Sequence, residues 1–493
     1  MKRIYFLSGL ILLLTWAAQG QTLHSGNVSG IWYAGSNPHV ISGDVVVPPD
    51  SLLTLEAGVE VRFDGHYKFL VHGTLRAIGT PADSIIFTRN RPADDSRGWG
   101  IRFDSSSADT NILRYCRIEH GYAIDTIGSS GYSDIGGGVF CFNANLIIEN
   151  CHITHNTAST GGGIYIFNFL DYPVPKFVYI RSNLIDSNST ISKSYNACGG
   201  GGINVEGGQV TIERNLIIGN TYSGNDANYE GGGGIFVSNA TVFGPVQILN
   251  NTIYGNSSPK GAGIHTSRGF DGVIENNIIW RNRGSVNNDQ ITIETDYDPK
   301  PIPAGLIINY NDIQDSAIVV VYRNDRQDTA YSWLKNISAY PGFADTASYN
   351  FNLMEGSPCI DAGDPTSVHD PDNTIADIGA FYFWHINGIQ ESYQTPKYFS
   401  LEQNYPNPFN PSTNIRFSLP KASDVNLSIY NILGERIAVV VSEHMNAGTH
   451  LAEWNASGFA SGVYFYRLSA FPLESRDRQA GSFNETRKLI LLK

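Results

Sequence analysis

Cysteine, methionine and tryptophan are scarce in this chain, whose 493 residues include 5 Cys, 3 Met and 7 Trp. Five cysteines are too few, and odd in number, for a fold held by disulfides, which excludes the small cysteine-rich secreted scaffolds. After the first 20 residues no apolar run is long enough to cross a bilayer, so no transmembrane segment is expected. Windows with an apolar period of 3.6 residues are also missing, and this excludes a helical fold.

Positive charge is in short supply as well. The chain has 33 Lys and Arg against 46 Asp and Glu, a formal net charge of −13. Residues 396–493 carry ten basic and eight acidic side chains, which leaves −17 for residues 21–395. An acidic body repels nucleic acid, so we expect no nucleic-acid partner. It also repels anionic polysaccharides unless bound Ca²⁺ bridges the charges.

The first 20 residues have the pattern of a secretory signal peptide. Basic residues at positions 2 and 3 precede an apolar run at 4–16, and Ala18 and Gly20 stand at −3 and −1 of a cleavage before Gln21. The apolar run is too short for a stable membrane anchor. We therefore expect residues 1–20 to be removed on export.

Seven copies of one short template occupy the middle of the sequence. We index each copy on an isoleucine, at positions 118, 153, 185, 217, 253, 279 and 313. Leu or Ile stands five residues before it in every copy, and Asn stands three residues after it in five copies. Two residues before it, the first two copies have Cys and the other five have Asn. The spacing varies from 26 to 36 residues, as expected where loops of different length join similar coils.

Apolar residues alternate within each copy, and glycine-rich runs separate the copies. Alternating short strands with Gly or Asn at the corners are typical of a parallel β-helix. Coils stacked about 4.8 Å apart would align the recurrent Asn in two ladders, each amide donating to the next coil while the Asn tolerates left-handed backbone. The predicted ladder residues are Asn183, Asn215, Asn251, Asn277 and Asn311, and then Asn156, Asn188, Asn220, Asn256 and Asn282.

The sequence thus predicts an all-β protein whose residues 21–383 form a right-handed parallel β-helix with three short strands per coil. Residues 44–103 resemble the opening coils of exported bacterial β-helices of the pectin-lyase-like class, and 22–40 are expected to cap the first coil. The run YPGFADTASYNFNLMEGSPCIDAGDP from Tyr340, followed by ADIGAFYF from Ala376, resembles a recurrent closing segment of secreted β-helices. We interpret residues 341–383 as the last coil and its cap.

Acidic residues gather in this closing segment, at Asp364, Asp370, Asp372, Asn373 and Asp377. Their Asp-x-Asp-Asn core looks like the start of a calcium loop, although it lacks the Gly and the distal Glu of an EF-hand. The sequence thus identifies no certain cofactor and suggests Ca²⁺ here. The alternative is that Asp361 and Asp377 form turns by bonding local amides.

Residues 400–493 follow a polar linker at 384–399 and show alternating strands with a turn about every ten residues, the pattern of a small immunoglobulin-like β-sandwich. NYPNPFNPSTNIRF, the Leu-Gly and Gly-Val-Tyr motifs and the terminal strand resemble the type A sorting domain of type IX secretion cargo. The residues that carry this resemblance are Asn404, Pro406, Asn407, Pro408, Asn410, Pro411, Gly434, Gly462, Tyr464, Lys488 and Lys493.

The resemblance implies passage through the periplasm of a Gram-negative bacterium, recognition of residues 400–493 by the type IX machinery, and a final place on the outer surface or in the medium. The polar insert at 471–479 is longer than in the family pattern, which should not abolish recognition. The alternative is an immunoglobulin-like module without an address function.

No pattern identifies a catalytic site. Polysaccharide lyases and glycosidases need paired carboxylates, or Ca²⁺-binding carboxylates beside an Arg or Lys base. The residues four before each index isoleucine alternate in sign at Arg114, Glu149, Arg181 and Glu213, which we interpret as a surface ladder, with a catalytic Arg/Glu set as the alternative.

Two further pairs recur at matching positions. His120 and His155, near Glu119 and His152, are either corner residues or part of a zinc site. Cys116 and Cys151 stand where later copies carry ladder Asn, and the sequence leaves open whether they form a disulfide or stay as buried thiols.

Two functions remain open. The favoured one is a noncatalytic secreted or cell-surface scaffold that binds a glycan or another surface component through its loops and one sheet face. We expect it to be a monomer. Aromatic residues in IYIFNFLDY, from Ile164, could supply a sugar platform or pack in the core. The alternative is a polysaccharide lyase or glycoside hydrolase of the pectin-lyase-like class.

Overall fold

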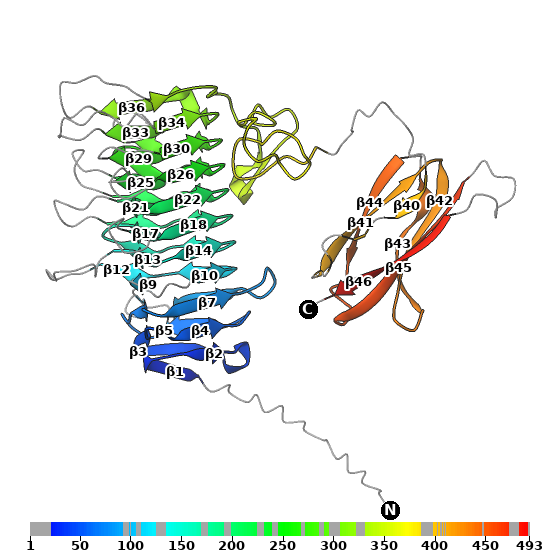
Figure 1. Cartoon of the computed structure of the whole chain (residues 1–493), viewed down its shortest axis with the longest axis horizontal. Coiled ribbons are helices and arrows are strands. Elements are labelled where there is room, and N and C mark those ends of the chain that lie inside the picture. Colours follow the sequence, from blue (N-terminus) through cyan, green and yellow to red (C-terminus); the bar gives the residue numbers. More distant parts are fainter. Residues whose placement is uncertain are drawn as a thin grey trace, which may run out of the picture. The chain divides into compact units, whose positions relative to one another are not determined.

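The protein is almost entirely β-structure in two compact units, residues 1–383 and 384–493 (Figure 1). Its structure is a computed structural model, and each unit is described by itself. It describes residues 21–491 except 92–97, 99, 105–109, 125–134, 169–175, 192–198, 224–230, 239–244, 268–271, 285–289, 295–305, 322–330, 386–397, 402, 405–406, 408, 410, 446–447 and 473–482. Residues 1–20, expected to be a signal peptide, lie outside the described residues.

In the first unit, parallel strands stack coil upon coil into three long sheets (Figure 1). Sheet I contains β2 (Gly30–Trp32), β4 (Leu52–Leu55), β7 (Thr74–Ile78), β10 (Asn111–Arg114), β14 (Leu146–Glu149), β18 (Phe177–Arg181), β22 (Gln209–Glu213), β26 (Val246–Leu249), β30 (Gly272–Glu275), β34 (Leu306–Asn309) and β37 (Tyr331–Ser332). Sheet II contains β5 (Glu60–Phe63), β8 (Ile85–Arg89), β11 (Cys116–Glu119), β15 (His152–Thr154), β19 (Leu184–Asp186), β23 (Leu216–Ile218), β27 (Thr252–Tyr254), β31 (Ile278–Trp280) and β35 (Asp312–Ile313). Sheet III contains β6 (Phe69–Val71), β9 (Ile101–Asp104), β13 (Val139–Phe142), β17 (Ile164–Phe167), β21 (Ile203–Glu206), β25 (Ile235–Ser238), β29 (Ile264–Ser267), β33 (Ile291–Glu294) and β36 (Ile318–Val321).

The remaining strands complete the coils. β1 (Thr22–Asn27) lies along β3 (His39–Val47), which pairs with β5 at one end and β6 at the other and so joins sheets II and III. Two-residue strands form a short fourth sheet after sheet II: β12 (Tyr122–Ala123), β16 (Thr157–Ala158), β20 (Ser189–Thr190), β24 (Thr221–Tyr222), β28 (Ser257–Ser258) and β32 (Arg283–Gly284). The parallel β-helix predicted from the repeats is confirmed.

The index isoleucines stack in one column of the core. Ile118 is in register with Ile153, and the same pairing continues through every later copy to Ile313. All seven are buried, with at most 2% of their surface exposed. Because each coil buries its apolar face only against its neighbours, this column is part of the apolar core that stabilises the stack.

Both sets of recurrent Asn form hydrogen-bonded ladders inside the corners. The Oδ1 of Asn215 accepts from the backbone N–H and the Nδ2 of Asn183, and the Nδ2 of Asn215 donates to Ile180 O one coil earlier. The same bonds recur along both ladders at 2.8 to 3.1 Å. Asn336 extends the first ladder by one coil, and Gln290 ends the second; neither was predicted.

The expectation that the ladder Asn adopt left-handed backbone is wrong. The residue with positive φ is the one before each ladder Asn, as at Ser182, Arg214 and Asn250 with φ from 51° to 56°. This residue makes the sharp corner, and the ladder Asn that follows points its amide inward to satisfy the backbone groups that the corner leaves unpaired.

The thiols of Cys116 and Cys151 are free and buried. The Sγ of Cys151 accepts from Cys116 N at 3.4 Å and donates to Leu113 O at 3.4 Å, as the amide of a ladder Asn does. Of the two alternatives left open by the sequence, the structure therefore has buried thiols that continue the ladder.

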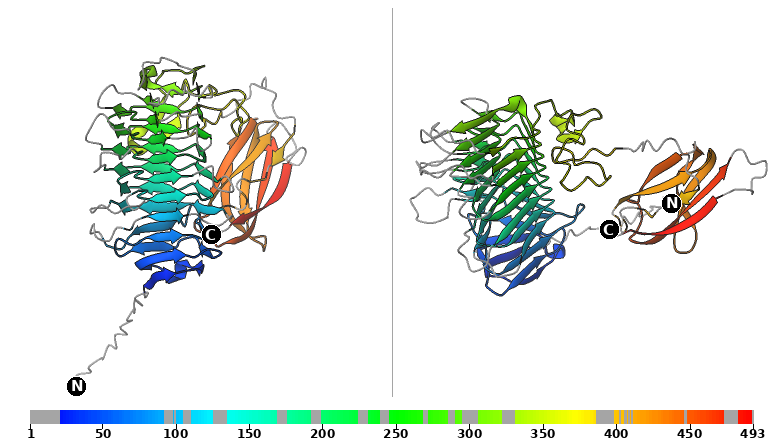
Figure 2. Two further views of the ribbon diagram at one scale, coloured as in Figure 1. Left: turned by 60° about the vertical axis from the view of Figure 1, so that its left-hand side comes forward. Right: turned by 45° about the horizontal axis from the view of Figure 1, so that its top comes forward.

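The closing segment does not stack as a last coil. It contains an antiparallel pair, β38 (Phe343–Asp345) and β39 (Asn350–Leu353), and lies beside the upper coils rather than on top of them (Figures 1 and 2). Its apolar residues form a second core against the outer face of sheet II, between Phe343, Phe351, Leu353, Cys359 and Ile378 on one side and Leu216, Ile218, Ile278 and Trp280 on the other. The interpretation of 341–383 as a coil and its cap is corrected accordingly.

The second unit is a small antiparallel β-sandwich. One sheet contains β40 (Ser400–Leu401), β41 (Ser412–Leu419) and β44 (Gly448–Asn455). The other contains β43 (Arg436–Met445), β42 (Ser423–Tyr430), β45 (Gly462–Pro472) and β46 (Phe483–Leu491). Side chains of both sheets, among them Phe417, Leu427 and Tyr466, share one core, as predicted for a β-sandwich.

Candidate functional site

The outer face of sheet II changes character along the stack. In the first two indexed copies the outward positions beside the index isoleucine hold Arg117, Glu119, His152 and Thr154. In later copies the same positions hold apolar residues such as Leu216 and Trp280, and these lie under the closing segment. The closing segment covers only the coils whose outward side chains are apolar. The earlier coils, which form the lower part of the face and whose outward side chains are polar, are not covered by it.

An open groove with a volume of about 720 Å³ lies in this lower part, at the corner between sheets I and II. The corner residues with positive φ, Tyr115, Asn150 and Ser182, direct their side chains away from the core. The groove is lined by Gly58, Ala82, Asp83, Ser84, Ile86, Tyr115, Cys116, Arg117, Asn150, Cys151, His152, Ser182 and Leu184. We refer to it as the corner groove.

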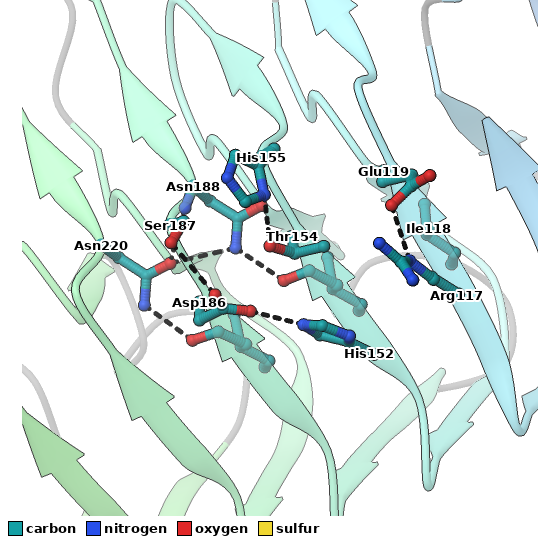
Figure 3. A network of polar contacts seen from close by, with 12 residues as sticks. Arg117, Ile118, Glu119, His152, Thr154, His155, Asp186, Ser187, Asn188 and Asn220 are labelled. Atoms are coloured by element: carbon teal, nitrogen blue, oxygen red, sulfur yellow. Dashed lines mark hydrogen bonds and ion pairs between the residues drawn. The ribbon is translucent and has the colours of Figure 1, made fainter. Parts of the chain in front are cut away.

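Hydrogen bonds fix the polar side chains beside the corner groove (Figure 3). His152 Nε2 lies 2.6 Å from Asp186 Oδ1, across two neighbouring coils, and Ser187 Oγ donates to the other oxygen of Asp186. Arg117 Nε donates to Glu119 at 2.6 Å. Arg117 and His152 remain 52% and 37% exposed, so their remaining donors face solvent. Such side chains lose little conformational freedom when a ligand binds.

Both carboxylates of this network are held in the ionised form. Burial alone would raise the pKa of Asp186, but hydrogen bonds from His152, Ser187 and Thr154 outweigh it and hold the pKa below its ordinary value. Burial likewise opposes ionisation of Glu119, and bonds from Thr88 and Arg117 lower its pKa. Neither group can donate a proton near neutral pH, so neither is suited to act as a general acid.

The candidate zinc residues are only partly brought together. The rings of His120 and His155 lie 5.8 Å apart, centroid to centroid, while His155 Nδ1 bonds Thr154 and His152 pairs with Asp186 (Figure 3). Within the described ranges, no three His, Cys, Asp or Glu side chains are placed to hold a metal ion.

The alternating charges form an ion-paired row on sheet I. Glu149 lies between two arginines, 2.7 Å from Arg114 Nε and 2.8 Å from Arg181 Nε. The side chains are partly exposed, so each contact contributes at most about 1 kcal/mol. This geometry is that of the surface ladder.

The five candidate calcium residues lie in the closing segment, where they make local bonds. Asp370 accepts from Arg214 Nη2 at 3.0 Å and from the Asp377 amide at 2.7 Å. Asp377 accepts from the amides of Asp361 and Phe383, and Asp364 and Asp372 accept from Thr366 and Thr374. Asn373 has a φ of 69° in the turn between them. The bonds of Asp377 match the turn alternative, whereas Asp370 also pairs with Arg214 of the β-helix; the calcium site stays a prediction.

The aromatic residues of IYIFNFLDY divide between two environments. Ile164 and Ile166 point into the core, and Tyr165 and Phe167 point outward from sheet III, packed against Phe140 and Phe142. Arg102 lies over the Phe140 ring at 4.4 Å. Farther along, partly buried Lys260 pairs with buried Glu294 at 3.2 Å, and His265 Nε2 lies 3.7 Å from the same carboxylate. The loops considered as binding elements, 123–135, 189–197 and 220–230, lie largely outside the described residues.

The residues that suggested a sorting signal gather at one end of the β-sandwich. Asn404 N–H donates to Tyr466 Oη, and Asn407 Oδ1 accepts from Ile490 N on the last strand. Gly462 on β45 is in register with Leu491 on β46, the residue that follows Ile490. Pro406, Pro408, Asn410 and Lys493 lie outside the described residues, and Pro411 O accepts from Ala456 N.

Residues 403–474 match the secretion system C-terminal sorting domain. The C-terminal unit carries a type IX sorting domain. The protein is therefore exported to the cell surface or the medium, and the sorting domain implies contact with the secretion machinery. No curated protein matches the chain. In the part of the chain that the structure describes, no helix is long and apolar enough to span a membrane.

Proposed function

We propose that the β-helix is a noncatalytic scaffold that binds a neutral glycan in the corner groove. It would reach the surface of a Gram-negative bacterium through the periplasm, after loss of residues 1–20 as a signal peptide. The observation that carries the proposal is an open groove in which the side chains of Arg117 and His152 are already fixed by hydrogen bonds.

The chemistry of the corner groove suits hydroxyl groups. Arg117, His152, Asn150 and Ser182 offer donors and acceptors along three successive coils, and Tyr115 adds an aromatic ring. Sugars are recognised by such convergent polar groups beside a flat apolar surface. Asp186 and Glu119, which bond His152 and Arg117 of the groove, are ionised and engaged, so neither is suited to supply the proton for glycosidic cleavage.

The charge of the body favours a neutral ligand. Residues 21–395 carry a net charge of −17, which repels uronate or sulfate polymers over a Debye length of about 8–10 Å. The paired charges in the corner groove do not offset this field. Binding should therefore depend little on ionic strength.

A glycan array probed with the full chain, followed by calorimetry on the neutral glycans that bind, tests the proposal. His152→Ala should weaken binding about tenfold, since it removes one charge-assisted contact worth about 1.5 kcal/mol. His155→Ala is the control, because His155 lies on the same face but outside the groove lining. Equal affinities for the two variants would reject the corner groove as the site.

One observation favours the second candidate, a polysaccharide lyase or glycoside hydrolase. Buried Glu294 and His265 on the outer face of sheet III form a group with partly buried Lys260, and His265 Nε2 has no hydrogen-bond partner among the described residues. Buried ionisable groups of this kind are common in catalytic sites. A reducing-end assay on a panel of polymers, with and without Ca²⁺, decides between the functions: release of ends that Glu294→Gln abolishes would establish the enzyme.

A further inference from the structure

One turn of the sorting domain presents two large apolar side chains to solvent. Residues 431–435 join β42 to β43, and Ile432 and Leu433 at its tip are 72% and 77% exposed. They are the most exposed large apolar side chains of the described sorting domain apart from Tyr398 at its start. A single exposed apolar residue is ordinary in a folded protein. Exposure of two adjacent large apolar side chains to water on a tight turn is unfavourable and marks a candidate binding surface.

The turn is held in one conformation by its own polar residues. Asn431 Oδ1 accepts from Leu433 N at 2.9 Å and from Glu435 N at 3.0 Å, and Asn431 Nδ2 donates to Glu435 Oε2 at 2.7 Å. Gly434 has a φ of 80°, which other residues rarely adopt. The two apolar side chains are therefore fixed outward, and a partner would not have to order them.

This turn projects from the end of the sandwich where the sorting motifs meet. Tyr430, just before the turn, is in register with Phe465, and Phe465 is in register with Lys488 on the last strand. The same last strand bonds Asn407 through Ile490. Segments that are far apart in sequence but shared by the sorting-domain resemblance thus meet at one end of the sandwich.

A basic side chain lies on each edge strand of the sheet next to the turn, and the acidic Glu435 of the turn itself is bonded to Asn431. Arg436 follows the turn and is in register with Tyr430, so Arg436, Tyr430, Phe465 and Lys488 make a row across the four strands of the sheet. Arg436 and Lys488 are exposed at the two ends of this row. A partner that covers the end of the sandwich would need an apolar pocket with acidic groups at its rim.

We propose that a receptor protein of the secretion machinery binds this end of the sorting domain, with Ile432 and Leu433 inserted in an apolar pocket. We choose this partner because residues 403–474 match a sorting domain, and a sorting domain acts by being recognised by the secretion machinery. The inference goes beyond the glycan proposal and does not depend on it, because the corner groove lies in the other unit.

The test measures delivery of the full chain in a host that has the secretion system, as the fraction found at the surface and in the medium against the fraction left in the periplasm. Ile432→Ser with Leu433→Ser should lower the delivered fraction about tenfold, because two buried anchor contacts are lost. The swap Ile432→Leu with Leu433→Ile keeps the apolar surface and should restore delivery.

Val439→Ser is the matched control, since Val439 is 49% exposed on β43 but is in register with Ser428, away from the turn. It should be delivered like the unchanged protein, and all variants should melt at the same temperature because the altered side chains are exposed. Full delivery of the double serine variant would overturn the proposal. Full delivery of a chain lacking residues 400–493 would overturn it together with the sorting role, whereas glycan binding by the purified protein would be unaffected by either result.

Discussion

Buried amides at the corners are the residues on which the stack most depends. Asn251 Oδ1 accepts from the N–H and the Nδ2 of Asn215, and its own Nδ2 donates to Ile212 O and Asn277 Oδ1. None of its surface is exposed, so no water replaces a lost bond. A buried polar group left without its partner costs more than an average hydrogen bond contributes.

Asn251→Ala should lower the free energy of unfolding by about 2–4 kcal/mol, because it leaves several buried groups of Asn215 and Asn277 unsatisfied. Urea denaturation measures this. Asn352→Ala is the control, since Asn352 is exposed and bonds only its neighbour Asn350 among the contacts described for it. A loss under about 0.5 kcal/mol in Asn251→Ala would show that the ladder contributes little.

At the other end of the stack, His24 makes the first coil sensitive to acid. Burial, and next the neighbouring His39, lowers the pKa of His24 to about 4. The ring stacks on Trp32 at 4.0 Å and bonds His39 at 2.9 Å. The pKa of a histidine in the unfolded chain is about 6.5. Between pH 4 and that value the unfolded chain therefore binds a proton at His24 that the folded chain does not bind.

The contribution of His24 to stability should therefore be complete above about pH 6.5 and fall as the pH drops toward 4. His24→Gln should remove that part of the pH dependence. The measurement is the difference in urea midpoint between the two proteins at pH 7.5 and at pH 4.5. A difference that stays constant between the two pH values would contradict the assignment.

Among the elements, the closing segment is the one whose position the sequence did not predict. Its resemblance to closing segments suggested a coil on top of the stack, yet it lies along sheet II. A signal for this was present: beside the index isoleucine the polar Arg117, Glu119 and His152 give way to Leu216, Ile278 and Trp280 in later copies. Apolar side chains that point outward on several coils must be covered by another part of the chain. These positions are recognised only when several copies of the repeat are compared, and not from any single copy.

An ion pair between Asp370 and Arg214 joins the closing segment to the β-helix. Substitutions of two aspartates distinguish this ion pair, which we call the latch, from a calcium site. Asp370 is buried against Arg214, so Asp370→Ala leaves a partly buried arginine unpaired and should destabilise the segment by about 3 kcal/mol. Asp372, bonded to Thr374, is less buried, so Asp372→Ala should change stability by less than about 1 kcal/mol. Hydrogen exchange of residues 343–383 would report both.

Calcium would give a different pattern. A Ca²⁺ site built from both carboxylates would raise the melting temperature of the unchanged protein on addition of Ca²⁺, and either substitution would remove that rise. The latch predicts no such rise in any of the three proteins.

For the whole molecule, the sequence was sufficient to predict the class of fold and the sorting domain. It was not sufficient to predict the candidate binding site. Repeated Ile and Asn predict stacked coils because identical positions must meet in a parallel stack, as Ile118 and Ile153 do. The corner groove was not predictable from the sequence. It depends on where the closing segment ends and on the contact between His152 and Asp186, which lie on neighbouring coils. Contacts between side chains 34 residues apart require the register of the coils and the rotamers, which no single copy of the repeat specifies.

Comparison of two arginine variants by calorimetry, with a neutral glycan identified on the array, tests the central claim that the corner groove is the binding site. Arg117 lines the groove and Arg181 does not, although the two side chains are similarly exposed, at 52% and 47%. Our account predicts that Arg117→Ala binds about tenfold more weakly while Arg181→Ala binds like the unchanged protein. Unchanged affinity in Arg117→Ala, or an equal loss in both variants, would contradict it.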